Sequence, residues 1–299
     1  MNKFTFTWYV QNEEAPVLLR EYLKTKHISK AALTDIKFHG GALFVNKKEV
    51  TVRTLLNEGD EVTVWFPPEI KSSSMEAEDI PLDIIYEDQH FVAVLKPAGM
   101  PTIPSLYQPN GSLASAVLYY YQKNDIPSTF HAVNRLDKDT SGIVLIAKHR
   151  FAHSLMSKQQ KEKVIKREYI AFVHGELKDE RGTVDRPIVR NPESIIERMV
   201  SEDGQPSITH YEKIDFVPTL NFTVVSLRLE TGRTHQIRVH MASIGHPLLG
   251  DDLYGGSLEM IERQALHSEK TSFIHPFTEE HIKLDAELPQ DMKNLWSHR

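Results

Sequence analysis

The segment HAVNRLDKDTSGIVLIAK, residues 131–148, runs from a polar, turn-forming stretch directly into an apolar strand. Asp, Asn, Ser and Gly favour turns, whereas the run of Ile, Val and Leu that follows predicts a buried strand. If the polar stretch is extended, alternate residues share a face, so Arg135, Asp137 and Asp139 project together while Leu136 anchors the other side. The segment therefore predicts a positive charge beside two carboxylates at the start of a buried strand.

This group of charges has three interpretations: an Asp-rich turn whose side chains bond the backbone, a calcium loop, or a catalytic site. In a calcium loop, Asp137, Asp139, Ser141 and Gly142 would take the first, third, fifth and sixth positions. The twelfth position, where a bidentate glutamate belongs, is Lys148, and a strand stands where the exiting helix belongs. Calcium is excluded on these grounds, and the structural turn and the catalytic site stay open.

Downstream of about residue 80, strands and helices are mixed without the regular βαβ repeat of a doubly wound sheet. Apolar runs and alternation predict strands at residues 90–99, 142–148, 167–175, 206–214 and 221–230. Helical periodicity predicts helices at residues 112–123, 150–160 and 234–245. We therefore expect an α+β fold in this part of the chain.

Upstream, the stretch PPEIKSSSMEAED, residues 67–79, interrupts the hydrophobic pattern with prolines, serines and acids. We place a linker at residues 69–79, between a small module at 1–68 and a larger domain at 80–299, and expect few contacts to cross it. The module is predicted to hold two short helices, at residues 16–27 and 29–39, a strand and turn at residues 42–50, and a second strand at residues 59–66. Ser29 is the expected cap of the second helix, and Gly40 and Gly41 its end.

Composition excludes several classes of protein. The chain has 299 residues and no cysteine, which excludes disulfides, thiolate zinc sites, iron–sulfur clusters and a cysteine nucleophile. It has no GxGxxG, Walker or HExxH motif, so we expect no nucleotide cofactor and no metal. The net charge of -6 argues against a protein that coats nucleic acid indiscriminately. Because no signal peptide or long apolar stretch is present, we expect a cytoplasmic protein without membrane contact.

Five segments, in order along the chain, resemble the motifs of the RluA-type family of RNA pseudouridine synthases. NRLDKDTSG, residues 134–142, is similar to the family's H-R-L-D-x-x-T-S-G motif, with Asn134 in place of histidine. The other four are KPAGMPTIPS from Lys96, REYIAFVHG, LETGRTHQIRVHMASIGHPLLGDDLYG and LHSEKTSFIHP. The resemblance implies the family's catalytic fold, a mixed, largely antiparallel central sheet with flanking helices.

The resemblance also implies an isomerase that converts uridine to pseudouridine in structured RNA, with large-subunit ribosomal RNA as the expected substrate and transfer RNA as the alternative. The reaction breaks a carbon–nitrogen glycosidic bond, turns the uracil, forms a carbon–carbon bond at carbon 5 and removes the proton there. Nothing is oxidised, so no cofactor is needed, but one carboxylate is. By family position that carboxylate is Asp137, as nucleophile or as base, with Arg238 as its cationic partner and Tyr169 packed against the uracil.

The expected RNA contacts follow from the same resemblance. Arg135 is the candidate side chain to fill the gap left by an extruded base. Further contacts are expected at Lys96, Arg233 and His235, and at Lys30 in the small module. The module itself resembles the RNA-binding module of a ribosomal small-subunit protein, although Lys47 stands where glycine is usual. A small packing domain is the alternative, and we expect a monomer.

Two other functions are less consistent with these residues. A glycoside hydrolase needs two carboxylates on opposite sides of a sugar, and Asp137 and Asp139 are too close on one segment to provide them. A non-catalytic RNA-binding protein has no use for the combination of Asp137, Tyr169 and Arg238.

Overall fold

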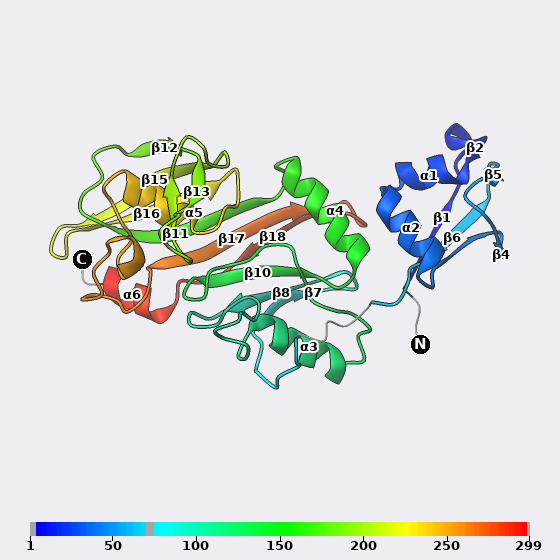
Figure 1. Ribbon diagram of the computed structural model, residues 1–299. Coiled ribbons are helices and arrows are strands. Elements are labelled where there is room, and N and C mark those ends of the chain that lie inside the picture. Colours follow the sequence, from blue (N-terminus) through cyan, green and yellow to red (C-terminus); the bar gives the residue numbers. More distant parts are fainter. Residues whose placement is uncertain (1–3, 70–74, 298–299) are drawn as a thin grey trace.

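The computed structural model describes residues 4–69 and 75–297, which form a small N-terminal part and a larger part that starts at β7 (Figure 1). The larger part is built on a 10-stranded sheet with the order β12-β15-β16-β11-β17-β10-β8-β7, to which β18 and β9 are added at β17 and β10. Strands β10 and β17 are parallel, and the other neighbouring strands are antiparallel. The expected α+β fold with a mixed, largely antiparallel sheet is confirmed.

The elements of the larger part are β7 (Ile84–Glu87), β8 (Phe91–Lys96), α3 (Leu113–Lys123), β9 (His131–Ala132), β10 (Ser141–Ala147), α4 (Arg150–Lys161), β11 (Lys166–His174), β12 (Arg181–Asp185), β13 (Ile188–Arg190), β14 (Arg198–Val200), β15 (Ile208–Val217), β16 (Phe222–Leu229), α5 (Gln236–Ser243), η2 (Asp252–Tyr254), β17 (Leu266–Ile274), β18 (His281–Asp285) and α6 (Gln290–Trp296). Every strand and helix predicted downstream of residue 80 is present, with ends shifted by a few residues. Strands β13 and β14 form a separate two-stranded hairpin.

Helices cover both faces of the sheet because successive strand residues point to opposite sides. On one face, α3 and α5 pack over residues such as Val144 of β10 and Ala171 of β11. On the opposite face, α4 packs on Ile143 of β10, and α6 packs on Phe172 of β11. All seven residues of β10 are buried, as expected for a strand covered on both sides.

The N-terminal part contains a four-stranded sheet, β1-β6-β3-β4, a two-stranded sheet, β2-β5, and the two predicted helices. Its elements are β1 (Thr5–Tyr9), η1 (Asn12–Glu14), β2 (Val17–Leu18), α1 (Leu19–Thr25), α2 (Lys30–Phe38), β3 (Ala42–Val45), β4 (Lys48–Glu49), β5 (Leu55–Leu56) and β6 (Glu61–Trp65). Ser29 caps α2 as predicted, because its Oγ accepts a hydrogen bond of 3.1 Å from the Ala32 N–H. Asn46 and Lys47 join β3 to β4 with φ of 49° and 66°, so the lysine itself takes the conformation that favours glycine.

Contacts between the two parts contradict the expectation that few would cross the linker. The rings of Phe66 and Phe151 stack with centroids 5.2 Å apart, and those of Phe6 and Phe277 stack at 4.8 Å. Phe151 lies on α4, which faces the N-terminal part in Figure 1. The expectation was wrong because it rested on the composition of the linker, whereas the apolar residues of this interface lie elsewhere in the sequence.

The predicted linker at residues 69–79 is only partly visible, because residues 70–74 lie outside the described residues. At one end, Glu69 accepts hydrogen bonds from the backbone N–H and Nε of Arg150, at 2.9 and 3.1 Å. At the other end, Asp79 accepts a hydrogen bond of 3.1 Å from the hydroxyl of Tyr119 on α3. The boundaries at 68 and 80 stay a prediction.

No helix in the described ranges has the length and apolar character needed to cross a bilayer.

Candidate active site

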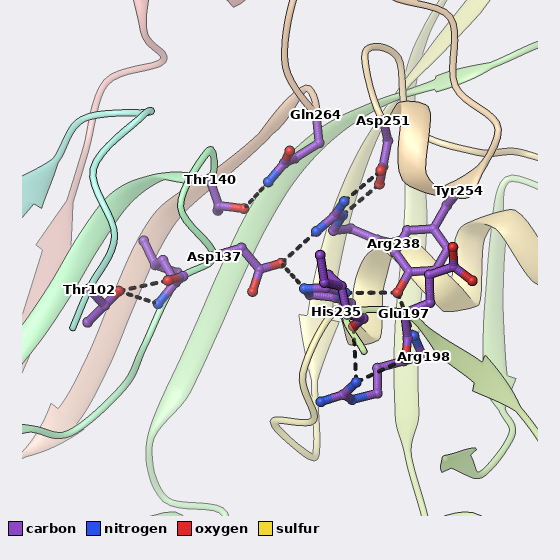
Figure 2. A network of polar contacts seen from close by, with 12 residues as sticks. Thr102, Asp137, Thr140, Glu197, Arg198, His235, Arg238, Asp251, Tyr254 and Gln264 are labelled. Atoms are coloured by element: carbon purple, nitrogen blue, oxygen red, sulfur yellow. Dashed lines mark hydrogen bonds and ion pairs between the residues drawn. The ribbon is translucent and has the colours of Figure 1, made fainter. Parts of the chain in front are cut away.

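A cavity of about 510 Å³ lies between β11, the start of α5 and the loop that precedes β10. Four stretches distant in sequence line most of it: residues 101–103, residues 132–138 with 140, residues 167 and 169, and residues 232–238. Its size is in the range of about 300 to 1,000 Å³ common for small-molecule sites, and it can hold one nucleotide. Asp137 and Arg238, 101 positions apart, meet in its wall (Figure 2).

The loop that carries Asp137 is fixed on both sides. The side-chain amide of Asn134, 5% exposed, bonds to the backbone of β10, where it donates to the Ile143 carbonyl at 3.1 Å and accepts from the Leu145 N–H at 2.9 Å. The Thr102 hydroxyl donates to the Leu136 carbonyl at 2.7 Å and accepts from the Leu136 N–H at 3.1 Å. Because the buried amide of Asn134 has both a donor and an acceptor partner on β10, it holds the Asp137 loop in one place.

The chain then turns immediately after Asp137. The Thr140 N–H donates to the Asp137 carbonyl at 3.2 Å and closes a turn over Lys138 and Asp139. Asp137 lines the cavity and Asp139 does not. The expected projection of both carboxylates on one face is therefore wrong, since alternation holds only in an extended chain.

The guanidinium of Arg238 holds two carboxylates at once. Its Nε and Nη2 each donate to Asp251 at 2.7 Å, and Nη1 donates to Oδ2 of Asp137 at 3.3 Å. Arg238 is 7% exposed and Asp251 is 1% exposed. Burial alone lowers the pKa of Arg238, but the hydrogen bonds and negative charge of Asp251, together with Asp137, outweigh burial and raise it above its usual value. The arginine is thus a permanent cation aimed at Asp137.

A second nitrogen faces the same carboxylate oxygen. His235 Nε2 lies 3.9 Å from Asp137 Oδ2, and His235 Nδ1 lies 2.8 Å from the hydroxyl of Tyr254. His235 has φ of 57°, so α5 starts only at Gln236, two residues later than the start predicted from the sequence. A non-glycine residue in the left-handed region costs free energy, and such residues gather at functional sites.

Comparison with known proteins agrees with this geometry. Residues 90–243 match the sequence model of the RNA pseudouridylate synthase family. The chain belongs to this family. As a pseudouridine synthase it is an isomerase that acts on RNA.

Relatives of this synthase span nearly the whole chain. The uncharacterized RNA pseudouridine synthase YjbO of Bacillus subtilis is 52% identical over 93% of this chain and 97% of its own length. Ribosomal large subunit pseudouridine synthase D of Xanthomonas campestris is 35% identical over 90% of this chain and 84% of its own. The solved structure of human RNA Pseudouridylate Synthase Domain Containing 1 has the same fold, with a TM-score of 0.59 and 23% identity over 74% of this chain and 95% of that chain.

The structure brings most of the predicted site residues of the synthase together. Tyr169, on β11 at a shift of register against β17, is 4% exposed and lines the cavity. Arg135 and Arg233 line it too, and both are exposed. Lys30 is exposed at the start of α2 in the N-terminal part and does not line the cavity.

Lys96 contradicts its expected role as an RNA contact. It is 1% exposed, and its ammonium donates to the carbonyls of Pro97, Met100 and Lys138 at 2.9, 2.7 and 2.9 Å. Burial lowers the pKa of Lys96 to about 7. The lysine ties the Asp137 turn to β8, since Lys138 is the next residue along the chain. The RNA contact was expected from the family resemblance, which does not show that this ammonium is enclosed by carbonyls.

Asp251, Tyr254 and Thr102 were not singled out from the sequence. Asp251 and Tyr254 belong to the segment GDDLYG. In the structure Asp251 is buried and Asp252 is exposed, but nothing in the sequence of this segment distinguishes the two aspartates. Among residues 4–69 and 75–297, no group of three or more His, Asp or Glu side chains is placed to hold a metal ion.

Proposed function

We propose that Asp137 is the carboxylate with which this synthase isomerises uridine to pseudouridine. The observation that carries the proposal is the ion pair between Arg238 and Asp137 in the wall of a nucleotide-sized cavity. Arg238 and His235 both approach Oδ2 of Asp137. No hydrogen bond reaches Oδ1 from any residue in the described part of the chain, so Oδ1 is the oxygen left to act on the sugar or base.

The reaction needs little beyond this carboxylate. The bond between carbon 1′ and nitrogen 1 breaks, the uracil turns, and carbon 5 bonds to carbon 1′. The proton on carbon 5 is then lost and nitrogen 1 gains one, so product and substrate have the same atoms. Asp137 acts as nucleophile or as base in these steps, and the fixed Arg238 cation stabilises the negative charge that the carboxylate carries before it reacts and regains when product forms.

Two further side chains fit the handling of the base. Tyr169 offers a ring in the cavity wall, and a base stacked on an aromatic ring gains roughly 1–3 kcal/mol. Arg135 is exposed at the cavity and is long enough to enter a base stack when the target uridine leaves it. Extrusion costs a few kcal/mol, and these two contacts act to offset that cost.

The substrate we propose is large-subunit ribosomal RNA. Support comes from relatives named for the ribosomal large subunit, one of which is 35% identical over 90% of this chain. The N-terminal part, residues 1–68, would contribute RNA contacts through exposed residues such as Lys30. Pseudouridine mapping in RNA from cells with and without the gene tests the assignment: loss of a pseudouridine in transfer RNA alone would contradict it.

The test of the catalytic carboxylate is Asp137→Asn, with Asp139→Asn as the matched control. Asparagine keeps the shape and the turn-forming bonds of Asp137 but removes its charge. We expect Asp137→Asn to bind RNA with nearly unchanged affinity and melting temperature and to form no detectable pseudouridine, whereas Asp139→Asn, which does not line the cavity, stays active. Retention by Asp137→Asn of more than about a hundredth of the wild-type rate would refute the proposal, since loss of an essential group usually costs several powers of ten.

A further inference from the structure

A continuous line of polar contacts joins the β13–β14 hairpin to the carboxylate of Asp137 (Figure 2). The backbone N–H of Arg198, the first residue of β14, donates to the hydroxyl oxygen of Tyr254 at 2.9 Å. The same hydroxyl lies 2.8 Å from Nδ1 of His235, and the other nitrogen of this ring lies 3.9 Å from Oδ2 of Asp137.

The donors in this line can be assigned from chemistry. The Arg198 N–H can only donate, so among the described residues His235 Nδ1 is the one acceptor within hydrogen-bond distance of the Tyr254 hydroxyl, and we assign the hydroxyl proton to that bond. Nδ1 then accepts, so a neutral His235 carries its proton on Nε2, which faces Asp137. Burial lowers the pKa of His235 and raises the pKa of Tyr254, and both shifts favour the neutral forms that this assignment requires.

Tyr254 also touches the other group that holds Asp137. The guanidinium carbon of Arg238 lies 5.0 Å from the centre of the Tyr254 ring. One side chain therefore supports both Arg238, through the face of its ring, and His235, through its hydroxyl. These are the two residues that approach Oδ2.

The separation of 3.9 Å between His235 Nε2 and Oδ2 exceeds a hydrogen bond by about 1 Å. Catalytic hydrogen bonds are often long before substrate binds and shorten in the complex. In that complex, Oδ2 would accept one hydrogen bond from Arg238 and a second from His235 Nε2. Two donors at Oδ2 would fix the orientation of the carboxylate and leave Oδ1 facing the nucleotide.

We propose that His235 and Tyr254 are positioning residues that orient the Asp137 carboxylate through Oδ2 and tie that orientation to the β13–β14 hairpin through the Arg198 N–H. This inference rests on Asp137 as the catalytic group. Strand β14 also packs beside α5, and the contact with Tyr254 adds to that packing in holding the hairpin next to the site. The exposed Ile195 and Ile196 lie in the loop between its two strands.

The decisive variant is Tyr254→Phe in the full chain, assayed on the same RNA as the wild type. Phenylalanine keeps the ring beside Arg238 and removes only the hydroxyl. We expect kcat to fall by about 10- to 100-fold, the range in which small misplacements of a catalytic group lie, with KM changed less than about threefold. Tyr120→Phe is the control, because it removes the hydroxyl of another tyrosine, bonded to Glu87 at 2.6 Å and remote from the cavity.

Two variants of His235 test the second link. In His235→Gln the side-chain amide keeps an N–H donor near the position of Nε2, whereas His235→Leu removes it. We expect the glutamine variant to retain at least about ten times the kcat of the leucine variant. Because His235 and Tyr254 act in series, the double variant Tyr254→Phe/His235→Leu should be no slower than His235→Leu alone.

Each outcome bears on the inference. An unchanged kcat in Tyr254→Phe, multiplicative losses in the double variant, or equal rates for the glutamine and leucine variants would overturn it. If Tyr254→Phe lowers the melting temperature strongly, the comparison between glutamine and leucine at His235 decides alone. Full activity of Asp137→Asn would instead refute the catalytic assignment, whereas an inactive Asp137→Asn beside a fully active Tyr254→Phe would refute only the positioning role.

Discussion

Arg238 illustrates how the site depends on single side chains. It uses three nitrogens to hold Asp251 and Asp137 in fixed directions, with Asp251 taking the paired contact. A lysine has one point charge and could not hold both carboxylates in one plane. The buried Asp251 also compensates much of the arginine's charge, which makes burial of the cation possible and leaves one N–H directed at Asp137.

A prediction about Arg135 follows from its exposure at the rim. We expect Arg135→Ala to slow modification of a uridine in a folded stem-loop about tenfold more than that of a uridine in a short flexible strand. Only the folded RNA must be unstacked, at a cost of a few kcal/mol. The measurement is the single-turnover rate on both substrates. Arg233→Ala is the control, because it removes another positive charge from the lining of the cavity. Equal losses on the two RNAs would remove Arg135 from the extrusion step.

The buried Lys96 leads to a prediction about pH. Burial holds the pKa of Lys96 at about 7 in the folded chain, against about 10.4 in an unfolded chain. Between these values the unfolded chain binds more protons, so this lysine makes stability rise with pH. From pH 7 to 9 we expect the unfolding free energy of the wild type to rise relative to that of Lys96→Met. The rise should be at most about 1.4 kcal/mol per pH unit.

Urea unfolding at pH 6, 7, 8 and 9 measures this difference, with Lys30→Met as an exposed control that should run parallel to the wild type. A Lys96→Met curve parallel to the wild type over the whole range would show that the lysine binds its proton equally in both states.

At the scale of elements, the approach of β10 to β17 determines where the Asp137 loop ends and β10 begins. The two strands run parallel, with Gly142 opposite Ser268. Gly142 has φ of 116°, and a Cβ at this position would collide with the Ser268 backbone, 2.6 Å from its nitrogen. The glycine of the T-S-G string is therefore required by strand packing and by backbone conformation together.

Gly142→Ala should consequently disrupt the site from a position outside it. The backbone conformation alone costs about 1–3 kcal/mol, and the collision adds to that cost. We expect a clearly lowered melting temperature and loss of pseudouridine formation. Gly111→Ala is the matched control: Gly111 also has a positive φ, 74°, but has nothing within 4 Å of its missing Cβ. Similar melting temperatures for the two variants would show that β17 can move away from β10 without cost.

At the scale of the whole molecule, the N-terminal part is joined to the synthase domain by an aromatic interface. Phe4, Phe6 and Phe66 meet His149, Phe151 and Phe277 there. His149 also caps α4, since its Nδ1 accepts a hydrogen bond of 3.0 Å from the Ala152 N–H. Burial of aromatic rings is among the largest favourable contributions per residue, so the two parts stabilise each other.

Removal of residues 1–68 should therefore do more than weaken RNA binding. It exposes Phe151, Leu155 and Phe277, which pack against the core of the N-terminal part. We expect a lower melting temperature and self-association that grows with protein concentration, measured by thermal unfolding and size-exclusion chromatography. A truncated protein that is monomeric and melts at the wild-type temperature would mean that this interface contributes nothing to stability.

The sequence by itself determined the type and order of the elements, the family, and three residues that meet in the cavity: Asp137, Tyr169 and Arg238. It could do so because strands and helices follow from short-range periodicity and because family motifs are contiguous strings. The same reasoning gave Lys96 a contact with RNA and projected Asp139 on the same face as Asp137, whereas Lys96 is buried and Asp139 does not line the cavity. Local patterns do not say where a turn redirects a side chain or how many carbonyls surround an ammonium.

Only the tertiary structure decided which side chains meet across the chain. Asp251 rather than Asp252 holds Arg238, Tyr254 bonds to His235 and to Arg198, and Phe277 joins the two parts of the molecule. Most of these contacts join segments that are far apart in sequence. The choice between Asp251 and Asp252 instead distinguishes two adjacent residues of the same type. Their partners are set by strand order, register and helix position, which arise when distant apolar faces are buried together and which no short stretch of sequence encodes.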